Sequence, residues 1–308
     1  MYSLGIDIGA TNTKFVLLKG FCTIKKEKIP TPKNREKLRE VLKENIENLI
    51  SNIPQSEIKG IGIGVPGPLN KERDFILNPP NLKCLSNCPF AKIIEKDLKI
   101  KTIMENDVNC FTLAEAMLEA GKGAEIVAGI TLGTGVGGGI IMKNPKTQTT
   151  NHKQNTNSKF QIFRGAFGSA GEFGFMTINF NGENSGFLED YCSERFFKRR
   201  KIYSKELEEK AKKGDKQALK IFQEYGKNLG IGISNIINTL DPEVIVIGGG
   251  ISKANKFFLK EAKKETQKRI LSPLSKKFVR IKITQLKDFA GAIGAALLIT
   301  KQSFDISN

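Results

Sequence analysis

Apolar residues recur along the chain with two different periods, and stretches of the two periods alternate. Short apolar runs at 2–7, 14–18 and 23–29 are typical of strands, and their close spacing predicts an antiparallel start. Leu38, Leu42, Ile46 and the neighbouring apolar residues then return at intervals of three and four, which predicts an amphipathic helix that ends near Ile50. This alternation predicts an α/β protein.

The same pattern continues to the C-terminus. It predicts strands near 59–65, 102–104, 125–132, 140–142, 244–247 and 279–285, and helices near 90–98, 108–120, 188–200, 204–213, 216–240, 255–270 and 288–300. Glycine alternates with isoleucine in the strand at 59–65, and glycine inside a strand indicates that another backbone approaches closely. The last helix carries small residues from Ala290 to Ala296, which predicts tight packing onto the first domain.

Composition and charge narrow the class of protein. Hydrophobic residues make up 39% and charged residues 26% of the chain, as in ordinary globular proteins. We expect no membrane span, because every apolar run is short, and no signal peptide at the N-terminus. The cysteines number five and are scattered, which favours free thiols in a reducing cytoplasm.

The net charge of +17 is unevenly distributed. Residues 253–287 carry twelve basic and two acidic side chains, and residues 194–220 carry eleven basic and five acidic ones. A nucleic-acid surface would explain this, but no aromatic residues are interleaved with the charges. We therefore favour solvated helix faces and expect no nucleic-acid partner. The polar segment 143–160 has low complexity and predicts a mobile loop.

Three glycine-rich turns each follow an apolar strand, at 6–14, 131–139 and 244–252. Glycine lets backbone N–H groups approach an anion, and the hydroxyls of Thr11, Thr13 and Thr134 would add donors. None of the three has the spacing of a Walker A or Rossmann motif. The first two lead into a second strand, which predicts a hairpin clamp around a polyphosphate.

Asp107 stands where the strand near 102–104 gives way to a helix. Aspartate is a good helix N-cap, so a capping role is the plainer interpretation. Ligands also gather at this edge of open α/β sheets, which leaves a functional role open.

Nine segments, read in order, resemble the ROK family (repressor, open reading frame, kinase) of the actin-like and hexokinase-like ATPases. They are LGIDIGATNTK, GIGVPGPLN, NPPNL, MENDVNCFTLAEA, GKGAEIVAGITLGTGVGGGII, GSAGEFGFM, LEDYCS, DPEVIVIGGGIS and DFAGAIGAALL. The resemblance implies a two-domain α/β fold of the hexokinase-like (ribonuclease H-like) class, with the active-site cleft between the domains. The smaller N-terminal domain would comprise 1–112 with 289–308, and the larger one 113–288 with the insert at 143–160.

The resemblance also implies roles for individual residues. Asp107 matches the catalytic base, and the sugar contacts would come from Gly67, Asn106, Asp107, Glu172 and Glu189. Mg²⁺ would lie near Asp7. The ATP-binding residues would be Asp7, Gly9, Ala10, Thr11, Asn12, Lys14, Gly133, Thr134, Gly135, Gly137, Gly138, Gly248, Gly249 and Gly250. Plainer alternatives are a turn role for Glu172 and a helix-start charge for Glu189.

The chain departs from the family at its zinc site. Phe175 stands where most members have a histidine, and the cysteine cluster is replaced by NFNGENSGFLE at 179–189. We therefore expect no structural zinc, and we expect Phe173, Phe175, Phe180 and Phe187 to stabilise this loop instead. Loss of the histidine leaves the identity of the sugar open.

The implied activity is the ATP-dependent phosphorylation of a hexose hydroxyl, with glucose to glucose 6-phosphate as the default in glycolysis. Fructose, mannose, N-acetylglucosamine and N-acetylmannosamine are alternative acceptors, and polyphosphate is an alternative donor. A ROK repressor is disfavoured because its DNA-binding domain would precede the first strand, and a non-catalytic sugar-binding or regulatory protein is the remaining alternative. The family further implies a cytoplasmic homodimer with no membrane partner.

Overall fold

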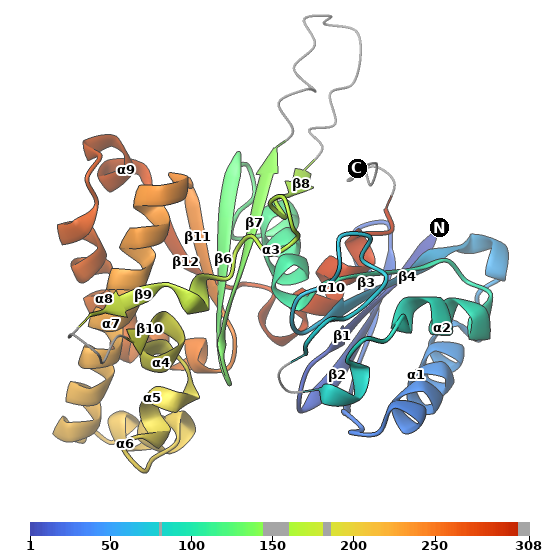
Figure 1. Cartoon of the computed structure of the whole chain (residues 1–308), viewed down its shortest axis with the longest axis horizontal. Coiled ribbons are helices and arrows are strands. Elements are labelled where there is room, and N and C mark those ends of the chain that lie inside the picture. The colour runs from blue at the N-terminus through green and yellow to red at the C-terminus, as the bar shows by residue number, and fades with distance from the viewer. Residues whose placement is uncertain (80–81, 144–159, 181–185, 301–308) are drawn as a thin grey trace, which may run out of the picture. The chain divides into compact units, whose positions relative to one another are not determined.

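The computed structural model describes residues 1–79, 82–143, 160–180 and 186–300. These residues fall into two compact units (Figure 1). Unit 1 consists of Met1–Leu118, Ile141–Ala170 and Phe289–Asn308, and unit 2 of Glu119–Ile140 and Gly171–Asp288. The α/β class is confirmed. The predicted domain division differs from these units at 113–118 and 141–170, and it stays a prediction. Most of the polar insert lies outside the described residues.

Unit 1 is built on a five-stranded sheet of order β3-β2-β1-β4-β5. The first three strands are antiparallel, whereas β4 is parallel to both β1 and β5. The elements of this unit are β1 (Tyr2–Ile8), β2 (Asn12–Lys19), β3 (Cys22–Pro30), α1 (Arg35–Ile50), β4 (Ile58–Val65), α2 (Phe90–Leu98), β5 (Thr102–Asn106), α3 (Asp107–Leu118), β8 (Phe160–Ile162) and α10 (Ala290–Leu297).

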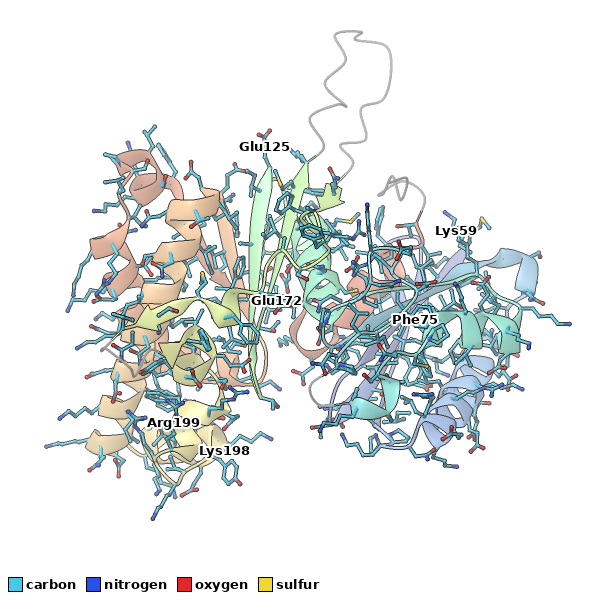
Figure 2. All side chains as sticks on the ribbon, in the orientation of Figure 1. Lys59, Phe75, Glu125, Glu172, Lys198 and Arg199 are labelled. Atoms are coloured by element: carbon cyan, nitrogen blue, oxygen red, sulfur yellow. The ribbon has the colours of Figure 1, made fainter. Side chains whose placement is uncertain are left out.

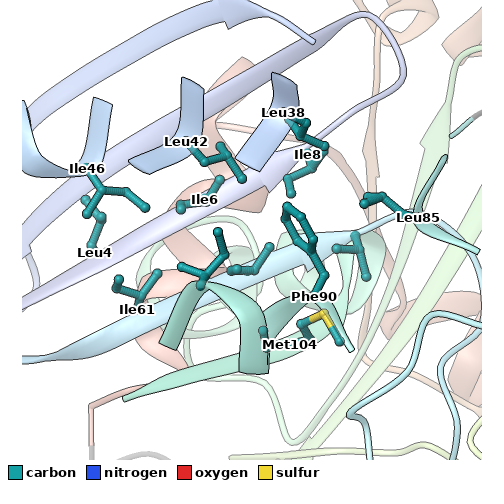
Figure 3. Packing of buried hydrophobic residues seen from close by; sticks show 14 of the residues in the cluster. Leu4, Ile6, Ile8, Leu38, Leu42, Ile46, Ile61, Leu85, Phe90 and Met104 are labelled. Atoms are coloured by element: carbon teal, nitrogen blue, oxygen red, sulfur yellow. The ribbon is translucent and has the colours of Figure 1, made fainter. Parts of the chain in front are cut away.

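The core of unit 1 lies between the sheet and helices α1 and α2 (Figure 3). Alternation along β1 sends Leu4, Ile6 and Ile8 into this core, where they join Leu38, Leu42 and Ile46 of α1. All six side chains are fully buried. Burial of each such side chain contributes roughly 1.5–3 kcal/mol to stability.

The opposite face of the sheet receives α10 at very short range. A Cβ on Gly5 or Gly62 would overlap the backbone carbonyls of Ala292 or Ala295, and one on Gly294 would overlap Cys110 in α3. Gly62 of β4 therefore faces α10, whereas Ile61 and Ile63 face the core. Both predictions, close backbone approach at 59–65 and tight packing of the last helix, are confirmed.

Unit 2 contains β12, β11, β6 and the first part of β7, in this order. The last residues of β7, Ile141–Lys143, belong to unit 1, where they pair with β8. Strand β11 is parallel to both β6 and β12. The strands are β6 (Ile126–Leu132), β7 (Val136–Lys143), β9 (Thr177–Asn179), β10 (Gly186–Phe187), β11 (Val244–Gly248) and β12 (Arg280–Ile283). The helices are α4 (Leu188–Cys192), α5 (Glu194–Lys198), α6 (Ser204–Lys212), α7 (Lys216–Leu240), α8 (Asn255–Arg269) and α9 (Pro273–Phe278).

Helix α7 packs against α8 through glycine. A Cβ on Gly226 would lie 2.5 Å from the carbonyl oxygen of Phe258, and one on Gly230 would lie 2.6 Å from that of Ala262. Nearby, Phe196, Phe197 and Tyr225 form edge and stacked ring pairs with centroids 5.2–5.5 Å apart. The two close-packed helices and the ring cluster form a large part of the core of unit 2.

The predicted helix over 188–200 is wrong as a single element. It is divided into α4 and α5 at Ser193, whose backbone is extended and whose side chain accepts a hydrogen bond from the Arg195 N–H. A serine can begin a second helix in this way because its hydroxyl satisfies a free N–H group. Among the described residues, no helix is long and apolar enough to cross a membrane.

Candidate functional site

The predicted residues of unit 1 gather where three parallel strands end. Asp7 in β1 is paired with Gly64 in β4, and Val65 in β4 is paired with Asn106 in β5. Parallel strands bring their carboxyl ends to one edge of the sheet, so the residues that follow β1, β4 and β5 share that edge. The sheet register therefore brings together the first glycine turn, Gly67 and the Asn106–Asp107 pair.

Asp107 is the first residue of α3, but it is not the helix cap. The Oδ1 atom of Asn106 accepts hydrogen bonds from the N–H groups of Val108 and Asn109, at 2.9 and 3.1 Å. The prediction that placed the capping role on Asp107 is therefore wrong, since Asn106 fills it. Asp107 accepts one bond at Oδ1, from the Val108 N–H at 3.0 Å.

The carboxyl of Asp107 is poised to take up a proton near neutral pH. Burial, and next the negative charge of Asp7, raise the pKa of Asp107 to about 7, while its backbone hydrogen bonds and Lys14 oppose the shift. A carboxyl with a pKa near the working pH combines a deprotonated population with useful basicity. This residue is the strongest candidate for a general base in unit 1.

Asp7 forms an ion pair with Lys14 at 2.9 Å across the first hairpin. Its side chain sits against the first turn of α10, where a Cβ on Gly291 would lie 2.9 Å from both Cγ and Oδ2. Only glycine leaves space for the carboxylate at that point. One carboxylate, together with water and substrate phosphates, is a common way to hold Mg²⁺, so Asp7 fits the expected metal position.

The turn after β1 is stiffened by segment 31–33. The Gly9 N–H donates to the Asn12 carbonyl at 3.0 Å, and the Thr31 hydroxyl donates to the Gly9 carbonyl at 2.7 Å. Lys33 donates to the Ala10 carbonyl. Thr13 is fully buried and its hydroxyl bonds that of Thr31 at 2.9 Å, so the prediction that it offers a donor to a phosphate is wrong.

Gly67 follows β4 and has a φ of 89°, a conformation that favours glycine. Its carbonyl accepts a hydrogen bond from the Asn106 side chain at 3.3 Å. The amide of Asn106 thus joins the turn after β4 to the start of α3. This bond and the cap described above use both ends of the amide that was predicted to contact a sugar.

In unit 2 the second glycine turn joins β6 to β7 and is held by α4 and α5. The Gly133 N–H donates to the Gly135 carbonyl, and the Gly133 carbonyl accepts the Glu194 N–H at 2.9 Å. The Val136 N–H donates to Oε2 of Glu189, also at 2.9 Å. A Cβ at Gly135 would overlap that oxygen, so a side chain there would displace the Glu189 carboxylate from this position.

Glu172 and Glu189 lie close enough to interact electrostatically. Burial, and next the charge of Glu189, raise the pKa of Glu172, which precedes the short helix η4 (Phe173–Phe175) and is labelled in Figure 2. Glu189 is in the first turn of α4 and pairs with Arg195 at 2.8 Å. Its carboxylate is therefore already engaged by this ion pair and by the Val136 N–H.

The third glycine turn adjoins the second. Gly248 of β11 pairs with Thr131 of β6, so both strands enter their turns at one edge of the sheet. Gly249 has a φ of 87°, and a Cβ there would overlap the backbone of Leu132. Of the predicted donor-site residues in unit 2, five lie in these two turns: Gly133, Thr134, Gly135, Gly249 and Gly250. Gly137 and Gly138 lie at the start of β7, and Gly248 is the last residue of β11.

The described residues contain no group of three or more His, Cys, Asp or Glu side chains that could hold a metal ion. The Phe175 ring, at the expected histidine position, packs on Phe187 with centroids 5.8 Å apart. Phe173 is nearly buried, whereas Phe180 is 79% exposed and does not add to this packing. The expected absence of zinc stays a prediction.

The comparisons with known proteins agree on one family. The ROK family model matches residues 3–302. The chain belongs to the ROK family. It is 31% identical to the N-acetyl-D-glucosamine kinase of Mannheimia succiniciproducens, over 96% of this chain and 99% of that protein. It is 29% identical to the xylose repressor of Caldicellulosiruptor bescii, over 96% of this chain and 77% of that protein.

Solved structures of ROK proteins share the fold. A ROK family glucokinase from Streptomyces griseus, in complex with glucose and AMPPNP, has a TM-score of 0.80 and 25% identity, over 97% of this chain and 99% of that one. The predicted family and hexokinase-like fold are confirmed. ROK relatives of this chain include both sugar kinases and repressors, so membership alone does not assign the activity.

One buried group of this ROK protein was missed by the sequence analysis. Glu105 pairs with Arg73 and Arg164, which are 32 and 59 residues distant in the chain. No spacing or periodicity in the sequence connects three such positions. The pairing became visible only in the folded structure.

Proposed function

We propose that this ROK protein is an ATP-dependent sugar kinase in which Asp107 is the general base. The observation that carries this proposal is the half-buried Asp107 carboxyl, whose pKa is raised to about 7 by burial and by Asp7. A repressor needs no group of this kind. A kinase needs one, because a sugar hydroxyl is a weak nucleophile at neutral pH.

In the proposed reaction, the Asp107 carboxylate accepts the proton of the sugar hydroxyl. The hydroxyl oxygen forms a bond to the terminal phosphorus of the donor as the bond from that phosphorus to its bridging oxygen breaks, so a nucleoside diphosphate leaves. Mg²⁺, when bound near Asp7, would neutralise charge on the donor phosphates. Alignment by the backbone donors of the glycine turns would supply most of the remaining rate enhancement.

The proposed acceptor is a hexose, with glucose first and the other sugars named above as alternatives. Gly67 and Asn106 in unit 1, and Glu172 and Glu189 in unit 2, are the proposed sugar contacts. The similar ROK family glucokinase from Streptomyces griseus was solved in complex with glucose and AMPPNP, an ATP analogue, which supports ATP as the phosphoryl donor. We further propose that the protein is a cytoplasmic homodimer, which sedimentation analysis would test.

A coupled assay of ADP release against the panel of sugars tests this function. Wild type should turn over at least one sugar, and Asp107→Asn should lower kcat by roughly 10²–10⁴-fold, the range for loss of a general base. Running the assay with polyphosphate as well as ATP identifies the donor. Normal turnover by Asp107→Asn would contradict the assigned base.

A sugar-binding regulator is the second candidate, and two observations favour it. Xylose repressors are among the similar proteins, and Glu189 is engaged by Arg195 and by the Val136 N–H. Calorimetric binding of a sugar, together with no turnover of any sugar by either donor, would support this candidate over the kinase.

A further inference from the structure

Glu105 is a buried carboxylate immediately before the Asn106–Asp107 pair. It is only 1% exposed, although it is the penultimate residue of β5 at the sheet edge that carries the candidate base. A carboxylate so far from water persists only if opposite charges and hydrogen-bond donors surround it. The structure supplies both.

Both oxygens of Glu105 accept hydrogen bonds. Oε1 accepts from the Asn106 N–H at 2.8 Å, from the Asn109 side chain at 3.0 Å and from Arg73. Oε2 accepts from Nε of Arg164 and forms an ion pair with Nη2 of the same guanidinium, both at 2.9 Å. Few acceptor positions remain, so the side chain is held in one orientation.

These contacts bracket Asp107. Glu105 binds the backbone N–H of the residue before Asp107 and the side chain of Asn109, two residues after it. Asn106 simultaneously caps α3 and reaches the Gly67 carbonyl. The backbone that carries Asp107 therefore cannot rotate without breaking several of these hydrogen bonds.

The cluster of Arg73, Glu105, Asn109 and Arg164 has several features that destabilise the fold. Arg73 has a φ of 58°, which is strained for a residue with a side chain, and burial lowers the pKa of its guanidinium against the influence of Glu105. Its Nε and Nη1 atoms are buried, and so is Oδ1 of Asn109, without hydrogen-bond partners among the described residues. Two guanidiniums for one carboxylate also leave an excess positive charge. Such costs are typical of positions held for function.

We propose that Glu105 is a positioning residue that fixes the Asn106–Asp107 turn, and that Arg164 holds Glu105 in its working orientation. The inference rests on the proposed function, in which Asp107 must lie at a defined place beside the acceptor hydroxyl. A displacement of about 1 Å in such a group can cost on the order of 10²-fold in rate. Neither Glu105 nor Arg164 touches the substrate in this assignment.

Arg164→Met is the decisive variant, because it leaves the charge-balanced pair of Arg73 and Glu105 in place. We expect kcat to fall by about 10–100-fold while KM for the sugar and the donor stays within about threefold of wild type. Arg164→Lys, which keeps the charge but loses the paired donors, should recover part of the lost kcat.

The matched control is Arg39→Met. Arg39 makes a two-point pair with Asp97 in the same unit, with both N···O distances 2.5 Å, but on exposed surface between α1 and α2. This variant should keep wild-type kcat. The melting temperature of Arg39→Met should fall little, because its ion pair is exposed, and that of Arg164→Met should fall more, because Glu105 is buried.

Amide hydrogen exchange provides a readout that does not depend on activity. In Arg164→Met the Asn106, Val108 and Asn109 amides, which donate to Glu105 or Asn106, should exchange faster than in wild type and in Arg39→Met. Unchanged exchange at these amides, or unchanged kcat in Arg164→Met, would overturn the inference. If wild type phosphorylates no sugar, the proposed function fails separately, and the exchange result still decides whether Arg164 holds the turn.

Discussion

At the scale of the residue, the most informative group is Asp107. The sequence offered it either as a helix cap or as a base, and the structure gives the cap to Asn106. The Asp107 carboxyl accepts backbone hydrogen bonds, one of them from the Val108 N–H, and interacts electrostatically with Asp7 and Lys14. Burial and the like charge of Asp7 outweigh these hydrogen bonds and favour the protonated form of Asp107, so the stability of the fold depends on pH.

Asp107→Asn should stabilise the protein at pH 8 but not at pH 4. The folded state binds this proton more tightly than the unfolded state, because the pKa of Asp107 is raised from 3.8 to about 7. Protonation of Asp107 therefore stabilises the folded state fully at a pH below 3.8, the pKa of this group in the unfolded chain, and this stabilisation is lost as the pH rises through 7. The loss amounts to at most about 4 kcal/mol in the free energy of unfolding. Asparagine does not titrate, so the difference in melting temperature should grow from pH 4 to pH 8.

Asp97→Asn provides a comparison of opposite sign. A hydrogen bond from Arg39 holds the pKa of Asp97 below its usual range, so this contribution is present at neutral pH and is lost as the solution is acidified. Asp97→Asn should therefore lower the melting temperature at pH 8. A pH-independent difference for Asp107→Asn, measured by calorimetry, would contradict the raised pKa.

At the scale of the element, glycine determines how helices and turns pack. Gly62 admits the backbone of α10, and Gly135 admits the Glu189 carboxylate against the turn between β6 and β7. The second case joins α4 to the proposed donor-binding turn, because Glu189 accepts the Val136 N–H while the Glu194 N–H donates to Gly133. A residue expected to contact the sugar thus also supports the turn expected to contact the donor.

Glu189→Gln should weaken nucleotide binding even without sugar. It removes the ion pair with Arg195 and weakens the charge-assisted bond from Val136, so the turn loses part of its support. A loss of about 1 kcal/mol corresponds to a dissociation constant for AMPPNP roughly fivefold higher, measurable by titration calorimetry.

Asp190→Asn is the matched control for Glu189→Gln. Asp190 lies next to Glu189 in α4 and pairs with Arg199 at 3.0 Å and with Arg195 at 3.6 Å. Its carboxylate accepts the Phe187 N–H, whereas that of Glu189 accepts the Val136 N–H beside the turn. The affinity of Asp190→Asn for AMPPNP should stay within about twofold of wild type, which corresponds to a change of about 0.4 kcal/mol in binding free energy. Equal affinity of Glu189→Gln and wild type would show that the carboxylate does not support the turn.

At the scale of the whole molecule, the fold is that of the ROK sugar kinases. The Phe175 ring, which stands where the family resemblance predicted a histidine, packs on the ring of Phe187. Both rings remain substantially exposed, at 62% and 43%. The local stability supplied by this ring pair is therefore small, and η4 itself is held close to β7 at Gly174, which lies against the Val136 carbonyl.

The purified protein should contain no stoichiometric zinc by elemental analysis, and treatment with a chelator should leave its melting temperature unchanged. A structural zinc contributes on the order of 10 kcal/mol to local folding, so its removal would be evident as a large shift. One zinc per chain, or a chelator-induced drop in melting temperature, would contradict the expectation.

Much of the architecture was accessible from the sequence because it depends on local periodicity. The amphipathic helices α1 and α7, the apolar strands and the three glycine turns each follow from short-range patterns, and their order resembles one family. Even the close approach of α10 was predicted, since glycine at alternate positions of β4 leaves space on only one face of the sheet. Asp107 was found because it stands at a strand-to-helix junction.

Tertiary structure alone decided the contacts between positions distant in sequence. The Asn106 cap and the division of one predicted helix at Ser193 depend on hydrogen bonds to residues only two or three positions away. Thr13, however, turned inward to bond Thr31, 18 residues away, and no local pattern records that contact. Glu105 is the clearest example of a contact that only folding creates. Its charge is tolerable only because folding brings Arg73 and Arg164 to it, and no local pattern records that meeting.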